Sequence, residues 1–143
     1  MFDYFANPTR FVRIADALFW PLVIVASGLL MAGLYYGLIA SPADYQQGET
    51  VRIMYVHVPA AWLATLGYVL MGICALFYIV WRHPLADVAL RAMAPVGAVF
   101  AMLTLVTGSL WGKPMWGAWW VWDARLTSML ILFFFYVAVI ALA

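Results

Sequence analysis

Four long uncharged stretches alternate with short segments that hold the charged residues of the chain. The uncharged stretches cover approximately residues 17–39, 59–80, 92–110 and 126–143. Each is close to the length of about 20 apolar residues that a helix needs to cross the hydrocarbon core of a bilayer. The pattern predicts an all-α integral membrane protein, in which residues 1–143 form a single polytopic domain built as a four-helix transmembrane bundle.

Local signals refine the first span. Asn7 followed by Pro8 is typical of a helix start, with Asn7 as the cap and Pro8 as the first helical residue. An apolar face over residues 11–18 predicts a helix at the membrane surface that leads into the span. Pro21 is expected to kink or start the span. Gly33 and Gly37 form a G-x-x-x-G pattern, which favours close packing against another helix.

Composition supports the membrane assignment and narrows the function. Hydrophobic residues make up 69% of the chain and charged residues 9%, with a mean hydropathy of +1.01. Lipid therefore has to solvate most of the surface. The formal net charge is +1 and the sequence has no basic stripe, which excludes a nucleic-acid surface. Cys74 is the single cysteine and is expected to be a small buried residue.

The number of crossings predicts which histidine lies near the tryptophan-rich segment. Two crossings separate His57 from residues 110–127, so both are predicted at the same membrane face, whereas His83 is predicted at the opposite face. If the N-terminus is inside, the cytoplasmic side has four basic residues and the outer side has three, which only weakly favours this orientation.

Five of the eight tryptophans fall between residues 111 and 122. On a helix, Trp116, Trp119, Trp120 and Asp123 would share one face. Because glycine and proline interrupt residues 112–117, we expect a tryptophan-rich external loop, with a turn and then a short interfacial helix, between the third and fourth spans. An aromatic belt at the interface is one interpretation. Five indoles in so short a segment favour another, a platform for a large, flat, apolar ligand with anionic edges.

Haem has these properties. His57, which is expected at a helix start with Pro59 in the first turn, could be the axial ligand of the iron. Arg125, Lys113 or Arg52 could pair with the propionates. Asp123 could orient a tryptophan or histidine, pair with Arg125, or cap the fourth span. On its own, His57 could equally be a histidine that is hydrogen-bonded at a helix start.

Motifs of other functional classes are absent from the sequence or weak. The sequence has no H-E-x-x-H, P-loop or G-x-S-x-G motif and no C-x-x-C-H motif for covalent haem attachment, so we expect no enzyme. A transmembrane haem permease or channel is an alternative, but it needs a polar path, and the spans contain only scattered hydroxyls. A membrane b-type cytochrome would need histidines inside its helices, and the predicted spans have none.

Two segments resemble a known family. Residues 111–128, W-G-K-P-M-W-G-A-W-W-V-W-D-A-R-L-T-S, are similar to the tryptophan-rich WWD signature of bacterial haem-handling membrane proteins. Their details, together with Y-V-H-V-P-A-A-W at residues 55–62, resemble the cytochrome c maturation protein C (haem exporter protein C) family. The resemblance implies that His57 is one of two external axial histidines. It also implies that Trp119, Trp120, Trp122 and Asp123 contact haem b, which is bound non-covalently and in transit.

The same resemblance implies a location and partners. It implies a bacterial inner (plasma) membrane protein with a cytoplasmic N-terminus and with His57 and the tryptophan-rich segment in the periplasm. The protein would hold haem at that face and deliver it to a periplasmic haem chaperone. Its other partners would be the membrane and ATPase subunits of an ABC-type assembly and a small membrane subunit. Family members have about six spans, so we expect this chain to be the N-terminal two-thirds of the family domain.

Overall fold

The structure is a computed structural model that describes residues 7–142, and every regular element within this range is helical. The elements are α1 (Pro8–Tyr35), a short π-helical turn η2 (Tyr36–Ala40), α2 (Val51–Trp81), α3 (Pro84–Trp116) and α4 (Ala124–Leu142). Four helices are long and apolar enough to cross a membrane. The predicted all-α membrane fold with four spans is therefore confirmed, and the chain is a multi-pass membrane protein.

The helices extend beyond the uncharged stretches from which they were predicted. α2 begins at Val51 rather than at residue 59, and α3 covers residues 84–116 rather than 92–110. Helical hydrogen bonding does not stop where the hydrocarbon ends, so charged residues such as Arg52 and Lys113 belong to the terminal turns. Pro59, which was expected in a first turn, consequently lies inside α2.

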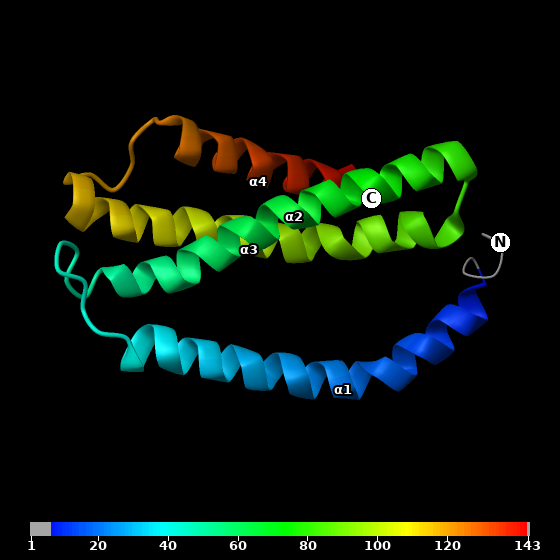
Figure 1. Ribbon diagram of the computed structural model, residues 1–143. Coiled ribbons are helices and arrows are strands. Elements are labelled where there is room, and N and C mark those ends of the chain that lie inside the picture. The colour runs from blue at the N-terminus through cyan, green and yellow to red at the C-terminus, as the bar shows by residue number, and fades with distance from the viewer. Residues whose placement is uncertain (1–6, 143) are drawn as a thin grey trace.

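The start of α1 follows the sequence signals. The Asn7 side chain accepts hydrogen bonds from the backbone N–H groups of Thr9 and Arg10, and Pro8 is the first helical residue, as predicted. Residues 8–18 are continuous with the span rather than a separate surface helix. Figure 1 shows that α1 bends along its length, and Pro21 lies inside it. Proline cannot donate the backbone hydrogen bond and clashes with the preceding turn, which accounts for a bend.

α3 lies at the centre of a three-helix bundle, between α2 and α4 (Figure 1). Its buried face consists of small residues, which allow neighbouring helices to approach closely. These residues are Ala86, Ala94, Gly97, Ala98, Ala101, Thr104, Thr107, Gly108 and Gly112. In a membrane, where lipid is as apolar as the side chains, such close packing is a main source of helix association.

Tyr136 of α4 joins all three helices of the bundle. Its side chain is fully buried, and its hydroxyl donates a hydrogen bond of 2.6 Å to the Ala64 carbonyl of α2. Its ring lies directly against Gly97 of α3, where an added Cβ would overlap the ring atoms. The position of α4 therefore depends on the absence of a side chain at residue 97.

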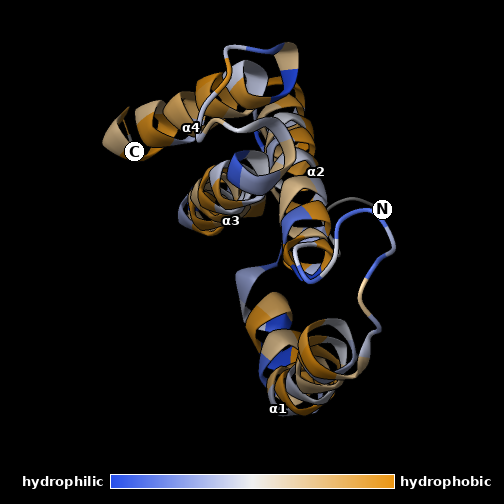
Figure 2. Ribbon diagram, turned by 90° about the vertical axis from the view of Figure 1, so that its left-hand side faces the viewer, coloured by the Kyte–Doolittle hydropathy of each residue, from blue (hydrophilic) through white to orange (hydrophobic). Residues whose placement is uncertain are grey.

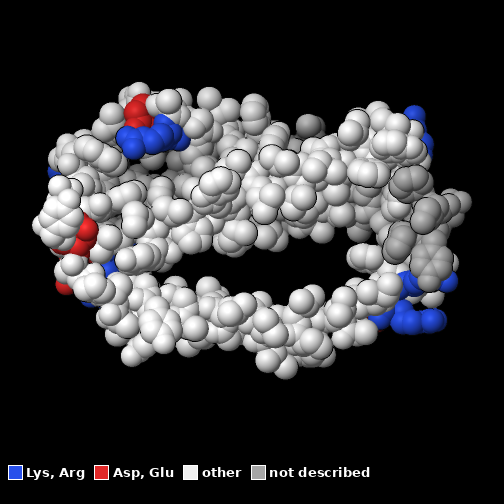
Figure 3. Space-filling model, in the orientation of Figure 1, with Lys and Arg blue, Asp and Glu red and all other residues white. Residues whose placement is uncertain are grey.

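α1 stands apart from the bundle. None of its residues is buried, and Figures 1 and 3 show open space between α1 and the other helices. Contact occurs near η2, where Gly37 packs against Tyr55 of α2. Gly33 has no atom near its Cβ position, so only one of the two glycines of the G-x-x-x-G pattern serves close packing within this chain.

Charge and hydropathy follow the expected membrane arrangement. Charged side chains gather at two opposite ends of the molecule, and the surface between them is uncharged (Figure 3). The helices are largely hydrophobic, with hydrophilic residues concentrated in the connections and helix ends (Figure 2). α2 and α3 are joined by a tight turn in which Arg82 has a φ of 53°. This turn places His83 at the opposite end of the bundle from His57, which confirms the predicted separation of the two histidines.

Candidate functional site

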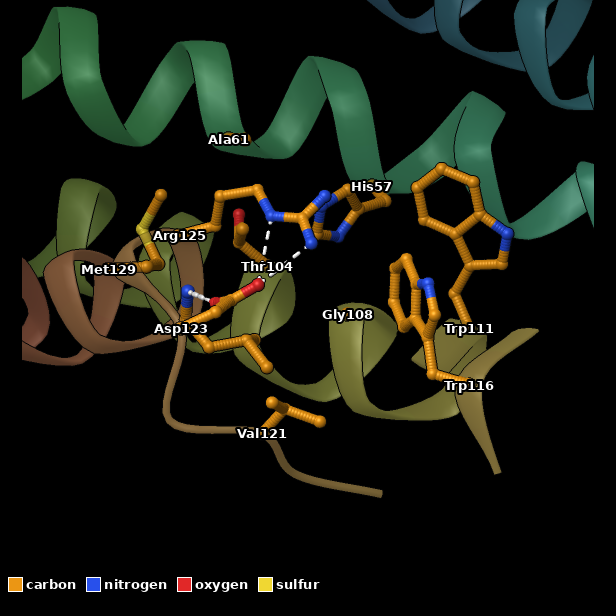
Figure 4. A pocket seen from close by; sticks show the side chains of 11 residues that line it. His57, Ala61, Thr104, Gly108, Trp111, Trp116, Val121, Asp123, Arg125 and Met129 are labelled. Carbon is orange, nitrogen blue, oxygen red and sulfur yellow. Dashed lines mark hydrogen bonds and ion pairs between the residues drawn. The ribbon is translucent and has the colours of Figure 1, made fainter. Parts of the chain in front are cut away.

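A pocket lies at the end of the bundle that contains the tryptophan-rich segment (Figure 4). It has a volume of about 560 Å³, within the range of pockets that hold cofactors and small ligands. Side chains of α2, α3, α4 and the α3–α4 loop surround it. The lining residues are His57, Ala61, Thr104, Gly108, Trp111, Trp116, Val121, Asp123, Arg125, Leu126 and Met129.

His57 is held by a hydrogen bond between helices. Its Nδ1 lies 3.0 Å from the Thr107 hydroxyl oxygen of α3. When the Thr107 hydroxyl donates its proton to the Leu103 carbonyl, at 2.7 Å, its oxygen is left to accept from Nδ1–H. In that arrangement the imidazole is protonated on Nδ1, and the lone pair of Nε2 is free to bind a metal.

The location of His57 differs from the expectation. It lies inside α2, beyond the first turn, because the helix begins at Val51. The prediction that His57 marks a helix start is wrong, and so is the premise that no histidine lies inside a helix. Space for the ring comes from Gly108 of α3, where a Cβ would lie 3.1 Å from His57 Cε1.

Two indoles form the side of the pocket next to His57. The ring centroids of Trp111 and His57 are 5.8 Å apart, and those of Trp111 and Trp116 are 6.2 Å apart. Trp116 was a predicted site residue, but Trp111 and Thr107 were not. Helical spacing could have predicted that Thr107 and Trp111 belong to the site, since residues 104, 107, 108 and 111 share one face of α3.

The other three tryptophans of the tryptophan-rich segment, Trp119, Trp120 and Trp122, lie in the α3–α4 loop and do not line the pocket. α3 ends at Trp116, followed by Gly117 with a φ of 77°, a conformation that favours glycine. Residues 117–123 contain no helix, so the expected short interfacial helix is wrong, whereas a tryptophan-rich loop between the third and fourth spans is confirmed. Trp119 is 56% exposed and Trp122 is 75% exposed. The Trp120 ring packs edge-on against Trp122 at 5.3 Å, and its Nε1 has no hydrogen-bond partner among the described residues.

Asp123 lies across the pocket from the indoles, and the Arg125 side chain extends from the start of α4 into the pocket (Figure 4). The Asp123 carboxylate accepts a hydrogen bond from the Leu126 backbone N–H at 2.9 Å and thereby caps α4. It also pairs with the Arg125 guanidinium at 2.8 Å, so two of its three proposed roles are present together. The guanidinium carbon lies 5.2 Å from the centre of the Trp116 ring, a cation–π distance. The Arg125 side chain remains exposed, so its guanidinium is available to bind an anionic group.

Acidification is expected to release the start of α4 through Asp123. The hydrogen bond from the Leu126 N–H, followed by that from Arg125, lowers the pKa of Asp123 from 3.8. A lowered pKa stabilises the folded state at neutral pH, and this stabilisation is lost only as the pH falls below 3.8. We expect the protection of the Leu126 amide against hydrogen exchange to fall in that range. Asp123→Asn, which keeps the capping oxygen, should remove this pH dependence, and its persistence in Asp123→Asn would contradict the assignment.

Arg52 and Lys113 have structural partners. Arg52 pairs with Glu49 and donates to the backbone carbonyls of Leu38 and Ser41, so it joins η2 to the start of α2. Lys113 donates to the Gly117 carbonyl at 3.1 Å and lies 6.0 Å from the Trp119 ring centre. Neither residue lines the pocket, so Arg125 is the lining residue with a positive charge.

The pocket therefore combines three chemical properties. His57 offers a metal-binding nitrogen, Trp111 and Trp116 offer aromatic surface, and Arg125 offers a positive charge at the rim. This combination suits a flat, apolar ligand that carries a metal and an anionic edge.

Comparisons with known proteins agree on one family. The sequence model described as "Heme exporter protein C" matches residues 1–143. The chain is 56% identical over 138 residues to heme exporter protein C of Bradyrhizobium diazoefficiens, covering 96% of this chain and 52% of the relative. It is 51% identical over 137 residues to heme exporter protein C of Escherichia coli K12, covering 96% of this chain and 56% of the relative. A relative from Marchantia polymorpha, 47% identical over 127 residues (89% of this chain, 53% of the relative), has a name that refers to cytochrome c biosynthesis.

These relatives extend beyond the matched region, and the chain spans about half of their length. The match nevertheless covers the whole of this chain, including the pocket. By sequence and by its four apolar helices, the chain belongs to the heme exporter protein C family.

Proposed function

We propose that this chain is the haem-binding part of a membrane subunit of cytochrome c biogenesis. The observation that carries the proposal is the His57 ring, which is hydrogen-bonded to Thr107 through Nδ1 and lies in a pocket walled by indoles. The family name refers to haem, and a neutral imidazole is a common axial ligand of haem iron. In this proposal the macrocycle packs against Trp111 and Trp116, and a propionate pairs with Arg125.

The haem is proposed to be haem b, bound without a covalent link. A thioether bond would need a cysteine beside the site, but Cys74 lines a different cavity together with His83, at the other end of the bundle. Reversible ligation by imidazole suits a protein that releases its ligand to another protein. No step of this function needs a bond in haem to be made or broken, so we propose that the subunit is not an enzyme.

We further propose that the pocket faces the periplasm across the bacterial inner membrane, with the N-terminus in the cytoplasm. The exposed indoles of Trp119 and Trp122 lie at the end of the molecule that contains the pocket. They are available to a second protein or to the exposed edge of the ligand, which supports delivery of haem to a periplasmic chaperone. The ABC-type membrane and ATPase subunits and a small membrane subunit are the proposed further partners.

Haem binding and haem delivery can be tested in one preparation. The protein in lipid nanodiscs is titrated with haemin, and a Soret band that saturates with one haem per protein is the expected result. Addition of a soluble apo haem chaperone should then move the band to that protein after separation. A protein that binds no haem would overturn the proposal as a whole. Binding without transfer would overturn delivery alone.

A haem permease is the alternative function, and the spans give it little support. The buried hydroxyls of Thr104 and Thr107 donate to the Phe100 and Leu103 carbonyls of their own helix. They therefore do not form a continuous polar path through the helices that the structure describes. Haem flux into vesicles that contain this protein alone would favour the permease.

Thr107 provides a sharper test of the ligand geometry. Thr107→Val removes the acceptor of His57 Nδ1–H, and loss of such a supporting partner weakens metal binding about tenfold. Thr107→Ser keeps the hydroxyl and should bind haem as the wild type does. Thr65→Val is the matched control, because Thr65 makes the same intrahelical bond to Ala61 but is exposed. Equal affinities of Thr107→Val and the wild type would contradict the proposed tautomer.

A further inference from the structure

One side chain of the loop between η2 and α2, residues 41–50, is hydrogen-bonded to a residue that lines the pocket. The Gln47 Oε1 accepts a hydrogen bond of 3.0 Å from the Trp111 indole Nε1–H, across 64 positions in sequence. Gln47 does not line the pocket itself, whereas Trp111 does. The contact therefore connects an external loop to the side of the pocket that lies next to His57.

The backbone around Gln47 is fixed by bonds within the loop. The Asp44 carboxylate accepts hydrogen bonds from the backbone N–H groups of Gln46 and Gln47, at 2.9 and 2.8 Å. Asp44 and Gly48 exchange two backbone hydrogen bonds. The Thr50 hydroxyl donates to the Gln47 carbonyl at 2.6 Å.

The loop is also attached at both of its ends. The Arg52 guanidinium donates to the carbonyl of Leu38 in η2 and to that of Ser41 at the start of the loop, and it pairs with the Glu49 carboxylate near the end of the loop. The Ser41 hydroxyl donates to the Gly37 carbonyl of η2 at 2.8 Å. The Gln47 amide is therefore presented to the indole from a backbone with little freedom to move.

The bond determines which part of Trp111 is available. An indole has one polar atom, the Nε1–H donor, and in Trp111 this group donates its hydrogen bond to Gln47. Trp111 consequently presents its apolar face to the pocket, and rotation about its side-chain torsions would break the bond. The same ring packs against His57 and Trp116, so its angle influences the position of both.

We propose that Gln47 is a positioning residue for Trp111 and, through it, for the haem plane beside His57. The proposal rests on the proposed haem-binding function for its consequence, but the hydrogen bond itself can be tested without haem. Arg52, expected from the sequence to contact the ligand, acts in this proposal by holding the loop that carries Gln47.

The first experiment uses the haem-free protein. Ultraviolet resonance Raman or indole ¹⁵N–H NMR reports the hydrogen bond of each tryptophan N–H. Gln47→Met keeps the size of the side chain but removes the acceptor, so the Trp111 signal should shift to that of an unbonded indole. Gln47→Glu keeps an acceptor and should preserve the bonded signal. Gln46→Met is the matched control, because Gln46 is the exposed neighbour. A Trp111 signal that is unchanged in Gln47→Met overturns the proposal.

The second experiment measures the consequence for haem. Loss of one neutral hydrogen bond corresponds to about a fivefold change in an equilibrium constant, so Gln47→Met should weaken haemin binding about fivefold. It should also change the Soret linear dichroism of oriented membranes, which reports the tilt of the haem plane. In a Trp111→Phe background, which lacks the indole N–H, Gln47→Met should have no further effect. Equal losses in both backgrounds would overturn the proposal. A wild type that binds no haem would overturn the proposed function but not the result of the first experiment.

Discussion

Replacement of His57 by alanine is expected to remove most of the haem that the protein binds. The change deletes the imidazole that is hydrogen-bonded to Thr107 through Nδ1. Substitution of residues that merely support a metal ligand costs 10- to 100-fold in affinity, so loss of the ligand itself should cost more than about 100-fold. Titration with haemin, followed at the Soret band in lipid nanodiscs, measures the change.

The chain contains a matched control for this experiment. His83→Ala removes the only other histidine, which lies at the opposite end of the bundle beside Cys74. It should leave the haem affinity unchanged. Equal haem content in His57→Ala and the wild type would remove the basis of the proposed function. A loss in His83→Ala alone would move the site to the other end of the molecule.

Substitution of Gly97 by alanine is expected to have the largest effect on stability. The new methyl group would occupy the space of the Tyr136 ring, which is fully buried and hydrogen-bonded to Ala64. Neither the ring nor the backbone of α3 can move without loss of that bond. Overpacking of this kind costs about 3 kcal/mol. Equilibrium unfolding by steric trapping in bicelles would measure the loss.

Two further variants separate this cause from a general effect of alanine. Gly72→Ala introduces the same methyl group in α2, where no atom lies within 4 Å of the new Cβ, and should leave stability nearly unchanged. In a Tyr136→Ala background the tyrosine ring is absent from this space, so Gly97→Ala should cause little further loss in the free energy of unfolding. A large cost of Gly97→Ala in that background would show that the Tyr136 ring is not the reason.

The span pattern predicted the fold well because the bilayer imposes a simple length rule on apolar helices. The number of spans, the cap at Asn7 and the opposite locations of His57 and His83 were all confirmed. The helix ends were less predictable, since the backbone continues as helix beyond the apolar stretch. This is why His57 lies within α2 rather than at its start.

The candidate site could be predicted only in part. His57, Trp116, Asp123 and Arg125 meet in one pocket, although a helical face was the wrong reason to group the tryptophan and the aspartate. Gly117 stops α3 and breaks that periodicity, and a glycine alone does not reveal whether a helix resumes after it.

Packing between helices was the least visible feature of the sequence. The pattern at Gly33 and Gly37 was noticed, but the longer row of small residues on α3, including Gly97 and Gly108, forms the close contacts. Alanine and glycine are common in membrane helices, so a row of them becomes informative only when the facing residue is known. For Gly97 that residue is Tyr136, and for Gly108 it is His57.

The hydrogen bond between His57 and Thr107 has a mechanical consequence. The imidazole belongs to α2, but the Thr107 hydroxyl that is hydrogen-bonded to its Nδ1 belongs to α3. A sliding motion of one helix along the other would separate the two side chains and free Nδ1 to exchange its proton with Nε2. The availability of the Nε2 lone pair therefore depends on the relative register of two transmembrane helices. In the proposed function, a partner protein that shifts this register would change the affinity of His57 for haem iron.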